Sequence, residues 1–166
     1  MKSGKTDEVF TPPYAIKPLL PYLKKELVIF ECAYGSGNLA KSLSDAGYTV
    51  IGDSQINFLE FEKDDCEWCD YIVTNPPYSK KTAFLKKCFE IGKPFALLLP
   101  LTALEGKERN AMYRNYGIQL IIPDRRIHFL MTETRQGSKS SSWFQTAWFT
   151  HGLNLPQQLN FVVGDW

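Results

Sequence analysis

From residue 27 onward, short apolar runs alternate with segments of helical periodicity, and this alternation restricts the fold more than any other feature. Strands that are separated by helices form parallel sheets with helices on both faces, because each crossover returns the chain to the same end of the sheet. We therefore predict an α/β fold of the Rossmann-like type, with a doubly wound and mostly parallel sheet. The strand-like runs cover residues 27–30, 48–52, 71–73, 95–101 and 118–122, and the helical patterns cover residues 38–46, 81–91 and 104–116.

The two ends of the chain show weaker patterns. Residues 143–149 alternate between polar and apolar side chains, which favours an antiparallel strand at an edge of the sheet. Residues 14–23 have a short helical pattern that Pro18 and Pro21 interrupt. Residues 1–8 are polar, and we expect them to be flexible. A chain of 166 residues with 44% hydrophobic residues predicts a single domain that spans residues 1–166.

The charged side chains are distributed unevenly. Residues 1–78 contain 7 Lys and Arg against 12 Asp and Glu, whereas residues 79–140 contain 12 against 5. A basic segment favours a polyanionic partner, because Lys and Arg neutralise phosphates. We expect phosphate contacts from some of its cations and solvated helix faces from the others: Lys80, Lys81, Lys86, Lys87, Arg109, Arg114, Arg125, Arg126, Arg135 and Lys139.

The four cysteines, at positions 32, 66, 69 and 88, are scattered in a way that is typical of reduced thiols in a cytoplasmic protein. Cys66 and Cys69 have the CxxC spacing of some zinc and redox sites, but no second CxxC follows and both histidines lie far downstream. We therefore predict no metal site. No apolar run approaches the roughly 20 residues that cross a bilayer, so we expect a cytoplasmic location and no membrane partner.

A loop that contains two glycines follows the predicted strand at residues 27–30. Glycines at a strand-to-helix junction let a ligand approach the backbone, and the helix N-terminus beyond them offers free amide groups. Gly35, Gly37 and Ala40 also satisfy the GxGxx(G/A) dinucleotide pattern, with Asp53 at a suitable distance to bind a ribose. The loop alone therefore leaves NAD binding and a plain tight turn open.

A second motif, Asn75-Pro76-Pro77-Tyr78, follows the predicted strand at residues 71–73. Two adjacent prolines lack N–H groups and fix φ near −65°, so they make a rigid loop whose carbonyl groups stay outside sheet and helix bonding. The Asn75 side chain and the Pro76 backbone can then both accept hydrogen bonds from an NH2 group, while Tyr78 supplies an aromatic face for a planar base.

Methylation of an aromatic amine requires such acceptors. The lone pair of the nitrogen is delocalised into the ring, and two acceptors on its hydrogens favour the pyramidal, nucleophilic form. The nitrogen must also lie in line with the methyl donor, at about 3–3.5 Å. Positioning and preorganised dipoles are sufficient for this chemistry, so no catalytic triad is needed.

These motifs resemble those of the N6-adenine DNA methyltransferases, which are class I, Rossmann-like enzymes that use S-adenosyl-L-methionine. The likeness extends over residues 10–149. Residues 31–37 look like the cofactor motif of the family, with Glu31 as the carboxylate that meets the methionyl ammonium, and residues 75–78 look like its catalytic motif. The resemblance implies catalytic roles for Asn75, Pro76, Pro77 and Tyr78, and cofactor contacts by Phe10, Thr11, Pro12, Glu31, Ala33, Gly35, Gly37, Asp53, Asn57, Phe58 and Asn75.

Two further segments are similar to the substrate-side motif of small, phage-type members: Arg126-Ile127-His128-Phe129 and Ser142-Trp143-Phe144. The resemblance places Tyr78, Lys80, Arg126, Phe129 and Lys139 against the substrate, although an aromatic residue such as Phe129 is as often part of a core. No segment is long enough to form a separate target-recognition domain. Sequence specificity would then be low, depend on residues 132–142, or come from a partner subunit or a homodimer.

We therefore expect S-adenosyl-L-methionine-dependent methylation of an exocyclic amino group, with adenine N6 in DNA as the first choice of substrate. RNA adenine and a protein glutamine amide remain alternatives, because both present an NH2 group on a planar carbon. A non-catalytic, cofactor-binding subunit that positions nucleic acid and an NAD-dependent oxidoreductase are also open.

Overall fold

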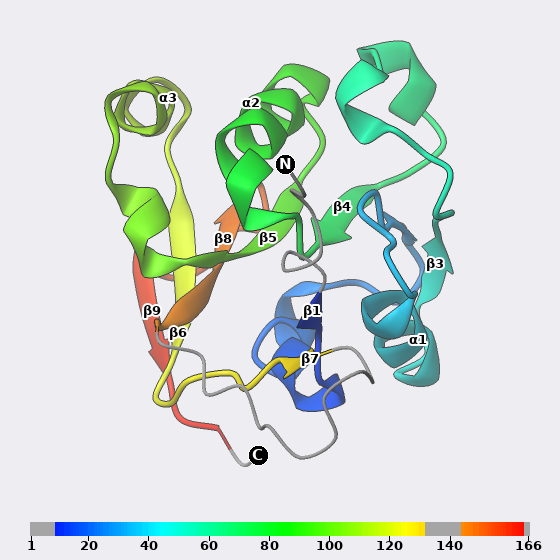
Figure 1. Cartoon of the computed structure of the whole chain (residues 1–166), viewed down its shortest axis with the longest axis horizontal. Coiled ribbons are helices and arrows are strands. Elements are labelled where there is room, and N and C mark those ends of the chain that lie inside the picture. Colours follow the sequence, from blue (N-terminus) through cyan, green and yellow to red (C-terminus); the bar gives the residue numbers. More distant parts are fainter. Residues whose placement is uncertain (1–8, 132–143, 165–166) are drawn as a thin grey trace, which may run out of the picture.

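A seven-stranded sheet forms the centre of the fold in the computed structural model, which describes residues 9–131 and 144–164 (Figure 1). The expectation for residues 1–8 lies outside the described residues. The strand order is β3-β2-β4-β5-β8-β6-β9. The strands are β2 (Val28–Phe30), β3 (Thr49–Ile51), β4 (Tyr71–Thr74), β5 (Phe95–Pro100), β6 (Gln119–Pro123), β8 (Thr146–His151) and β9 (Leu159–Val162).

The sheet is mixed and mostly parallel. Neighbouring strands from β3 to β5 are parallel, as are β6 and β9, whereas β8 is antiparallel to both β5 and β6. The predicted α/β class and the predicted antiparallel strand are thus confirmed, and the sheet is compatible with a Rossmann-like fold without being specific to it. The position of β8 differs from the expectation. It lies between β5 and β6 rather than at an edge, and β9 is the outermost strand on that side of the sheet. Residues 146–150 are all buried, as an interior strand requires.

Helices cover both faces of the sheet (Figure 1). The helices α2 (Lys81–Ile91) and α3 (Lys107–Tyr116) lie over one face, and α1 (Asn38–Asp45) lies over the other. Short 3-10 turns complete the layers: η1 (Pro13–Ile16) and η2 (Leu20–Tyr22) on the α1 side, and η3 (Phe58–Glu60), η4 (Lys63–Cys66), η5 (Tyr78–Lys80) and η6 (Leu101–Leu104) elsewhere.

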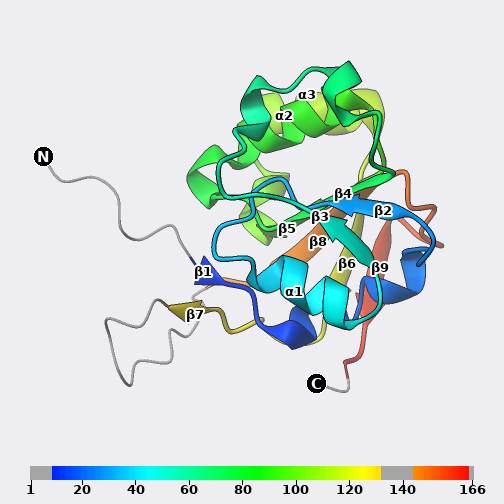
Figure 2. The ribbon, with the colours of Figure 1, turned by 90° about the vertical axis from the view of Figure 1, so that its right-hand side faces the viewer.

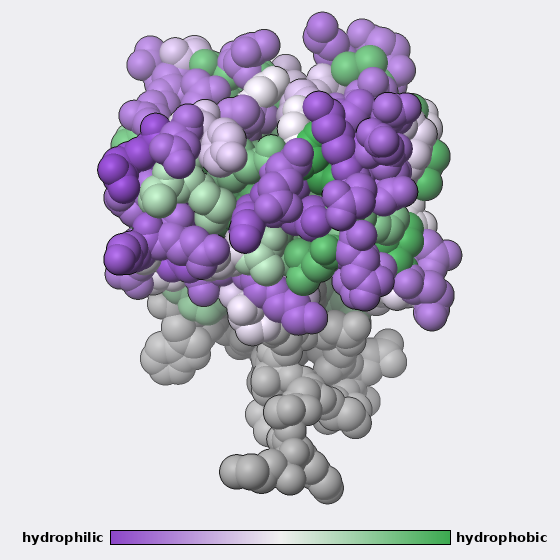
Figure 3. Space-filling view, turned by 90° about the horizontal axis from the view of Figure 1, so that it is seen from above, coloured by the Kyte–Doolittle hydropathy of each residue, from purple (hydrophilic) through white to green (hydrophobic). Residues whose placement is uncertain are grey.

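The side chains of β5 alternate between two cores, one on each face. Phe95, Leu97 and Leu99 pack on the α2–α3 side, whereas Ala96 and Leu98 pack on the α1 side. All of them have 0% exposure, so both faces of this strand are buried. The outer surface over α2 and α3 is mainly hydrophilic, with hydrophobic side chains in smaller patches between the charged ones (Figure 3).

The N-terminal segment is attached to the fold by contacts that are distant in sequence. The strand β1 (Val9–Phe10) pairs antiparallel with β7 (Leu130–Met131), and Figure 2 shows this ribbon beside the main sheet. Further along, the Trp148 indole Nε1 donates a buried hydrogen bond of 2.9 Å to the Ala15 carbonyl. Within the described residues, the helices are all too short or too polar to cross a lipid bilayer.

Candidate functional site

The candidate site lies where the carboxyl ends of β2 and β4 meet. From β2 the chain passes through α1 to β3 on one side of the sheet, and it then returns to β4 on the other side of β2. The connection that leaves β2 thus runs to β3, whereas the connection that leaves β4 runs through α2 to β5, on the opposite side. Open α/β sheets bind ligands at such a switch point. The glycine loop after β2 and the Asn75 loop after β4 are therefore neighbours.

A buried carboxyl group joins the two loops. The Glu31 side chain is 1% exposed, and its Oε1 accepts hydrogen bonds from the Thr74 hydroxyl and from the Ala33 backbone N–H, the latter at 3.1 Å. The Thr74 Oγ1 in turn accepts a 3.2 Å hydrogen bond from the Ala33 N–H. Glu31 thus holds the end of β2 against the end of β4.

Burial also changes the acidity of this group. Desolvation raises the pKa of the Glu31 carboxyl from 4.5 to about 7, and the hydrogen bonds from Thr74 and Ala33 oppose that rise. Near neutral pH the group therefore exchanges between its protonated and ionised forms. A ligand that brings a positive charge to this end of the sheet would favour the ionised form.

The two glycines of the loop have different surroundings. Both have positive φ, +52° at Gly35 and +80° at Gly37. A Cβ at Gly35 would meet only the Ala33 carbonyl oxygen, at 3.9 Å, whereas a Cβ at Gly37 would lie 2.9 Å from the Tyr34 ring. Gly35 therefore leaves open space beside the backbone, and Gly37 is required by packing under Tyr34.

The α1 helix begins directly after this loop. Gly37 is its N-cap residue, and α1 has no capping side chain and no acidic residue in its first turn. Its first amides are thus available to an anionic or polar group. A cavity of about 410 Å³ lies on the outer side of the same loop, between α1 and β3, and its lining includes Tyr34, Gly37 and Gly52.

The downstream residues of the expected cofactor site are placed unequally. Asp53 is exposed just after β3, where its Oδ1 accepts a 2.7 Å hydrogen bond from the Gln55 N–H. Asn57 is also exposed. Phe58, in contrast, is 1% exposed and packs edge-on against Phe30, with ring centroids 5.9 Å apart. The structure thus leaves the polar side chains of Asp53 and Asn57 available to a ligand and places Phe58 in the core.

Asn75 has the most informative contacts of the site. Its Nδ2 donates a 3.0 Å hydrogen bond to the Oγ1 of Thr11, a residue 64 positions earlier. Its Oδ1 is buried and has no hydrogen-bond partner in the part of the chain that the structure describes. A buried acceptor without a donor costs about 1–3 kcal/mol, and a ligand that supplies an N–H would remove that cost.

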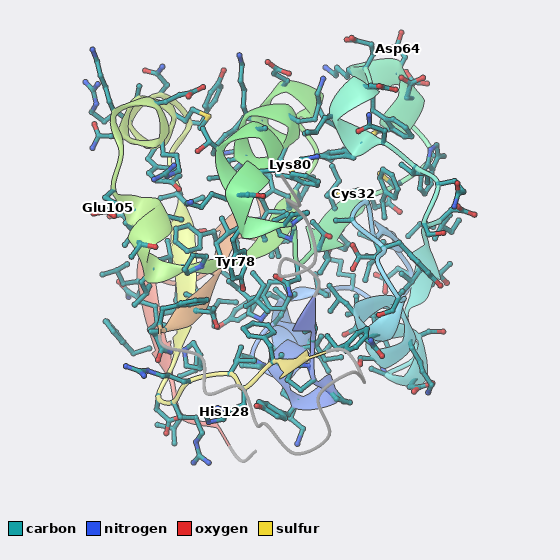
Figure 4. The ribbon with its side chains drawn as sticks, viewed as in Figure 1. Cys32, Asp64, Tyr78, Lys80, Glu105 and His128 are labelled. Atoms are coloured by element: carbon teal, nitrogen blue, oxygen red, sulfur yellow. The ribbon has the colours of Figure 1, made fainter. Side chains whose placement is uncertain are left out.

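The two prolines and Tyr78 shape the rest of this loop. Pro76 is buried and Pro77 is half-buried, and the Pro77 carbonyl accepts the Lys80 N–H at 2.9 Å, which starts the turn that leads into α2. The Tyr78 ring contacts Phe129 and Phe144 edge-on, with centroids 6.4 Å and 5.8 Å apart. Figure 4 labels Tyr78 near the middle of the molecule and Lys80 above it, at the start of α2.

The residues expected on the substrate side separate into exposed and buried members. Lys80 and Arg126 are exposed, as contacts with a phosphate would require. Phe129 is 5% exposed and belongs to the core on the α1 side, where it supports the Tyr78 ring rather than presenting its own face. Lys139 and Ser142-Trp143 lie outside the described residues.

All four cysteines are free and buried in the core on the α2 side. The Cys69 thiol donates a 3.3 Å hydrogen bond to the Cys66 carbonyl, and burial raises the pKa of both thiols, to about 12 for Cys69. In residues 9–131 and 144–164, no group of three or more His, Cys, Asp or Glu side chains has an arrangement that would hold a metal ion.

Sequence reasoning missed Thr74, which links the two loops of the site. A hydroxyl residue at the end of a fully buried strand is the signal that could have identified it, because such a group needs a buried partner. A search of protein-family models found none that matches the chain, and a search of curated proteins found no match either.

Proposed function

We propose that the chain is an S-adenosyl-L-methionine-dependent methyltransferase that modifies an exocyclic amino group, with adenine N6 in DNA as the substrate. The observation that carries the proposal is the Asn75 side chain. Its oxygen is a buried acceptor without a donor among the described residues, it follows β4 at the switch point of the sheet, and two prolines stiffen the backbone after it. An amino group of a ligand supplies the missing donor.

The roles of the chain in this reaction follow from these positions. The Asn75 Oδ1 accepts one hydrogen of the amino group and favours the pyramidal nitrogen, while the rigid Pro76-Pro77 backbone holds the amide in place. Tyr78, supported edge-on by Phe129, offers a ring on which a planar base can stack. S-adenosyl-L-methionine, when bound, supplies the electrophilic methyl group.

The residues after β2 fit such a cofactor in two respects. The backbone beside Gly35 is open, and the uncapped first turn of α1 provides amides for a polar group. Asp53 is exposed after β3 and is suited to hold ribose hydroxyls. Glu31 stabilises the loop from the protein interior, because its buried carboxyl accepts hydrogen bonds from Thr74 and Ala33.

The charge near Tyr78 supports a nucleic acid rather than a protein as the substrate. Lys80 and Lys81 follow Tyr78 after a single residue, Ser79, and Lys80 is exposed. Cations beside a base-sized aromatic ring are suited to a phosphate that flanks a target nucleotide. A base in duplex DNA would have to leave the stack at a cost of a few kcal/mol, which stacking on Tyr78 and phosphate contacts would offset.

The proposal is tested by incubating the purified chain with isotope-labelled S-adenosyl-L-methionine and separate pools of DNA, RNA and protein, followed by mass spectrometry of the digested products. We expect labelled N6-methyladenine in the DNA pool. Label in adenine of the RNA pool or in glutamine of the protein pool would identify a different substrate for the same chemistry. No label in any pool, with a thermal shift from NAD and none from S-adenosylhomocysteine, would contradict the proposal.

The Asn75→Ala variant tests the mechanism. Loss of one preorganised polar contact predicts a fall in turnover by about 10²-fold or more, with binding of S-adenosylhomocysteine retained. Asn115→Ala is the matched control, because Asn115 is an exposed asparagine on α3. Unchanged turnover in Asn75→Ala would remove Asn75 from the reaction.

A further inference from the structure

We infer that Thr11 is a positioning residue whose hydroxyl binds the Nδ2 end of the Asn75 amide and thereby leaves the Oδ1 end for a substrate that carries an amino group. The inference rests on the proposed function, and it adds to that function a residue that determines specificity. Thr11 is 6% exposed, and its Oγ1 accepts the 3.0 Å hydrogen bond from Asn75 Nδ2. The contact joins the N-terminal segment to the end of β4.

The orientation matters because the two ends of a side-chain amide have almost the same shape but opposite hydrogen-bonding character. With Nδ2 bonded to Thr11, the Oδ1 of Asn75 is the end left without a donor among the described residues. An acceptor in this place suits an exocyclic NH2 group, as in adenine. The opposite orientation would present an NH2 group, which suits a carbonyl, as in thymine, and leaves an amino substrate without its acceptor.

The backbone around Thr11 is held on both sides, so its hydroxyl is preorganised. Before it, Phe10 pairs with Leu130 in the β1–β7 ribbon. After it, the Pro12 carbonyl accepts the Ala15 N–H at 3.0 Å, and the Tyr14 hydroxyl accepts the His128 N–H at 2.9 Å. A group that is fixed before the substrate arrives needs no reorganisation during the reaction.

Three substitutions separate this role from others. Thr11→Val replaces the hydroxyl by a methyl group of similar size, Thr11→Ser keeps the hydroxyl, and Thr49→Val makes the first change at an exposed position in β3. We expect Thr11→Val to lower kcat by about three- to tenfold, the effect of one net hydrogen bond, with the KM for S-adenosyl-L-methionine unchanged. Thr11→Ser should recover most of the wild-type rate. Should Thr11→Val fail to fold, Thr11→Ala removes the hydroxyl without adding a methyl group in its place.

A second measurement is independent of activity. In a ¹H–¹⁵N NMR spectrum, the side-chain NH2 signals of Asn75 are the pair that disappears in Asn75→Ala. We expect this pair to shift and to exchange faster with solvent in Thr11→Val, and to stay in place in Thr11→Ser and Thr49→Val, because only Thr11→Val removes the hydrogen-bond acceptor.

Two results would overturn the inference. The first is an Asn75 NH2 pair that is the same in Thr11→Val and wild type. The second is a Thr11→Val enzyme whose KM for S-adenosyl-L-methionine rises while kcat is retained, because that split indicates a direct contact of Thr11 with the cofactor. If the wild-type chain methylates no amino-group substrate, the proposed function fails instead, and the NMR measurement still decides whether Thr11 orients Asn75.

Discussion

Replacing the buried carboxyl of Glu31 by an amide should change how the stability of the protein depends on pH. The pKa of this carboxyl is about 7 in the folded protein against an ordinary value of 4.5, because burial disfavours its charged form. Below pH 4.5 the group is protonated in both states. As the pH rises from 4.5 to 7, the unfolded chain releases the proton while the folded protein retains it, so the free energy of unfolding falls.

The size of the effect follows from that difference in pKa. At 1.36 kcal/mol per pKa unit, a raised pKa of this size lowers the free energy of unfolding by about 3 kcal/mol between low pH and pH 8. Glu31→Gln does not titrate, and its side-chain oxygen can still accept hydrogen bonds from Thr74 and Ala33. The stability of the variant minus that of wild type should therefore increase by about 3 kcal/mol over this pH range.

Urea denaturation of both proteins at pH 4.5, 6, 7 and 8 measures this difference, and other groups that titrate alike in the two proteins cancel. Glu105→Gln is the control for loss of a carboxyl group at the surface, since Glu105 is exposed next to η6. A difference between Glu31→Gln and wild type that stays constant from pH 4.5 to 8 would refute the reasoning, because it would mean that burial does not raise the pKa of Glu31.

Two further predictions concern the glycine loop and the buried cysteines. Gly37→Ala should destabilise the fold more than Gly92→Ala. Both glycines have φ near +80°, which costs a non-glycine residue about 1–2 kcal/mol, but of the two only Gly37 has a neighbour, the Tyr34 ring, within 4 Å of an added Cβ. Equal losses of stability in urea denaturation would disprove a role for Tyr34. All four cysteines should react with a thiol reagent at pH 8 far more slowly in the native protein than in urea, because burial protects them and raises the pKa of each thiol; rapid reaction of the native protein would show that this core opens readily.

The parts of the fold that sequence predicted are those with strong local periodicity. The amphipathic pattern of residues 81–91 matches the bounds of α2, and the apolar run at residues 95–101 contains β5. The strands β1 and β7 are two residues each and pair across more than 100 residues, so no local pattern marks them. The sequence did not predict β9, the outermost strand of the sheet, because its pattern is reversed: the apolar Leu159 and Phe161 are exposed, and the polar Asn160 is buried.

The candidate site divides in the same way. Sequence patterns placed Asn75 and the glycine loop each after a strand of a parallel sheet, and parallel strands bring their carboxyl ends to one edge. That the two strands are adjacent came from the structure. The partners of these residues did not follow. Thr11 reaches Asn75 across 64 residues, and Phe58 and Phe129 are buried by packing from distant elements. Such contacts depend on the tertiary arrangement, which a local motif does not determine.

The position of β8 between β5 and β6 has a consequence during synthesis on the ribosome. The chain emerges from its N-terminus, so β5 and β6 are made well before residue 146. Until then β5 can pair only with β4, and β6 has neither of its final neighbours, β8 and β9. For that interval the nascent chain carries an open edge on β5 and an unpaired, apolar β6, which chaperones can bind and other chains can join. Expression conditions that slow translation over residues 124–151 should therefore increase aggregation of this protein.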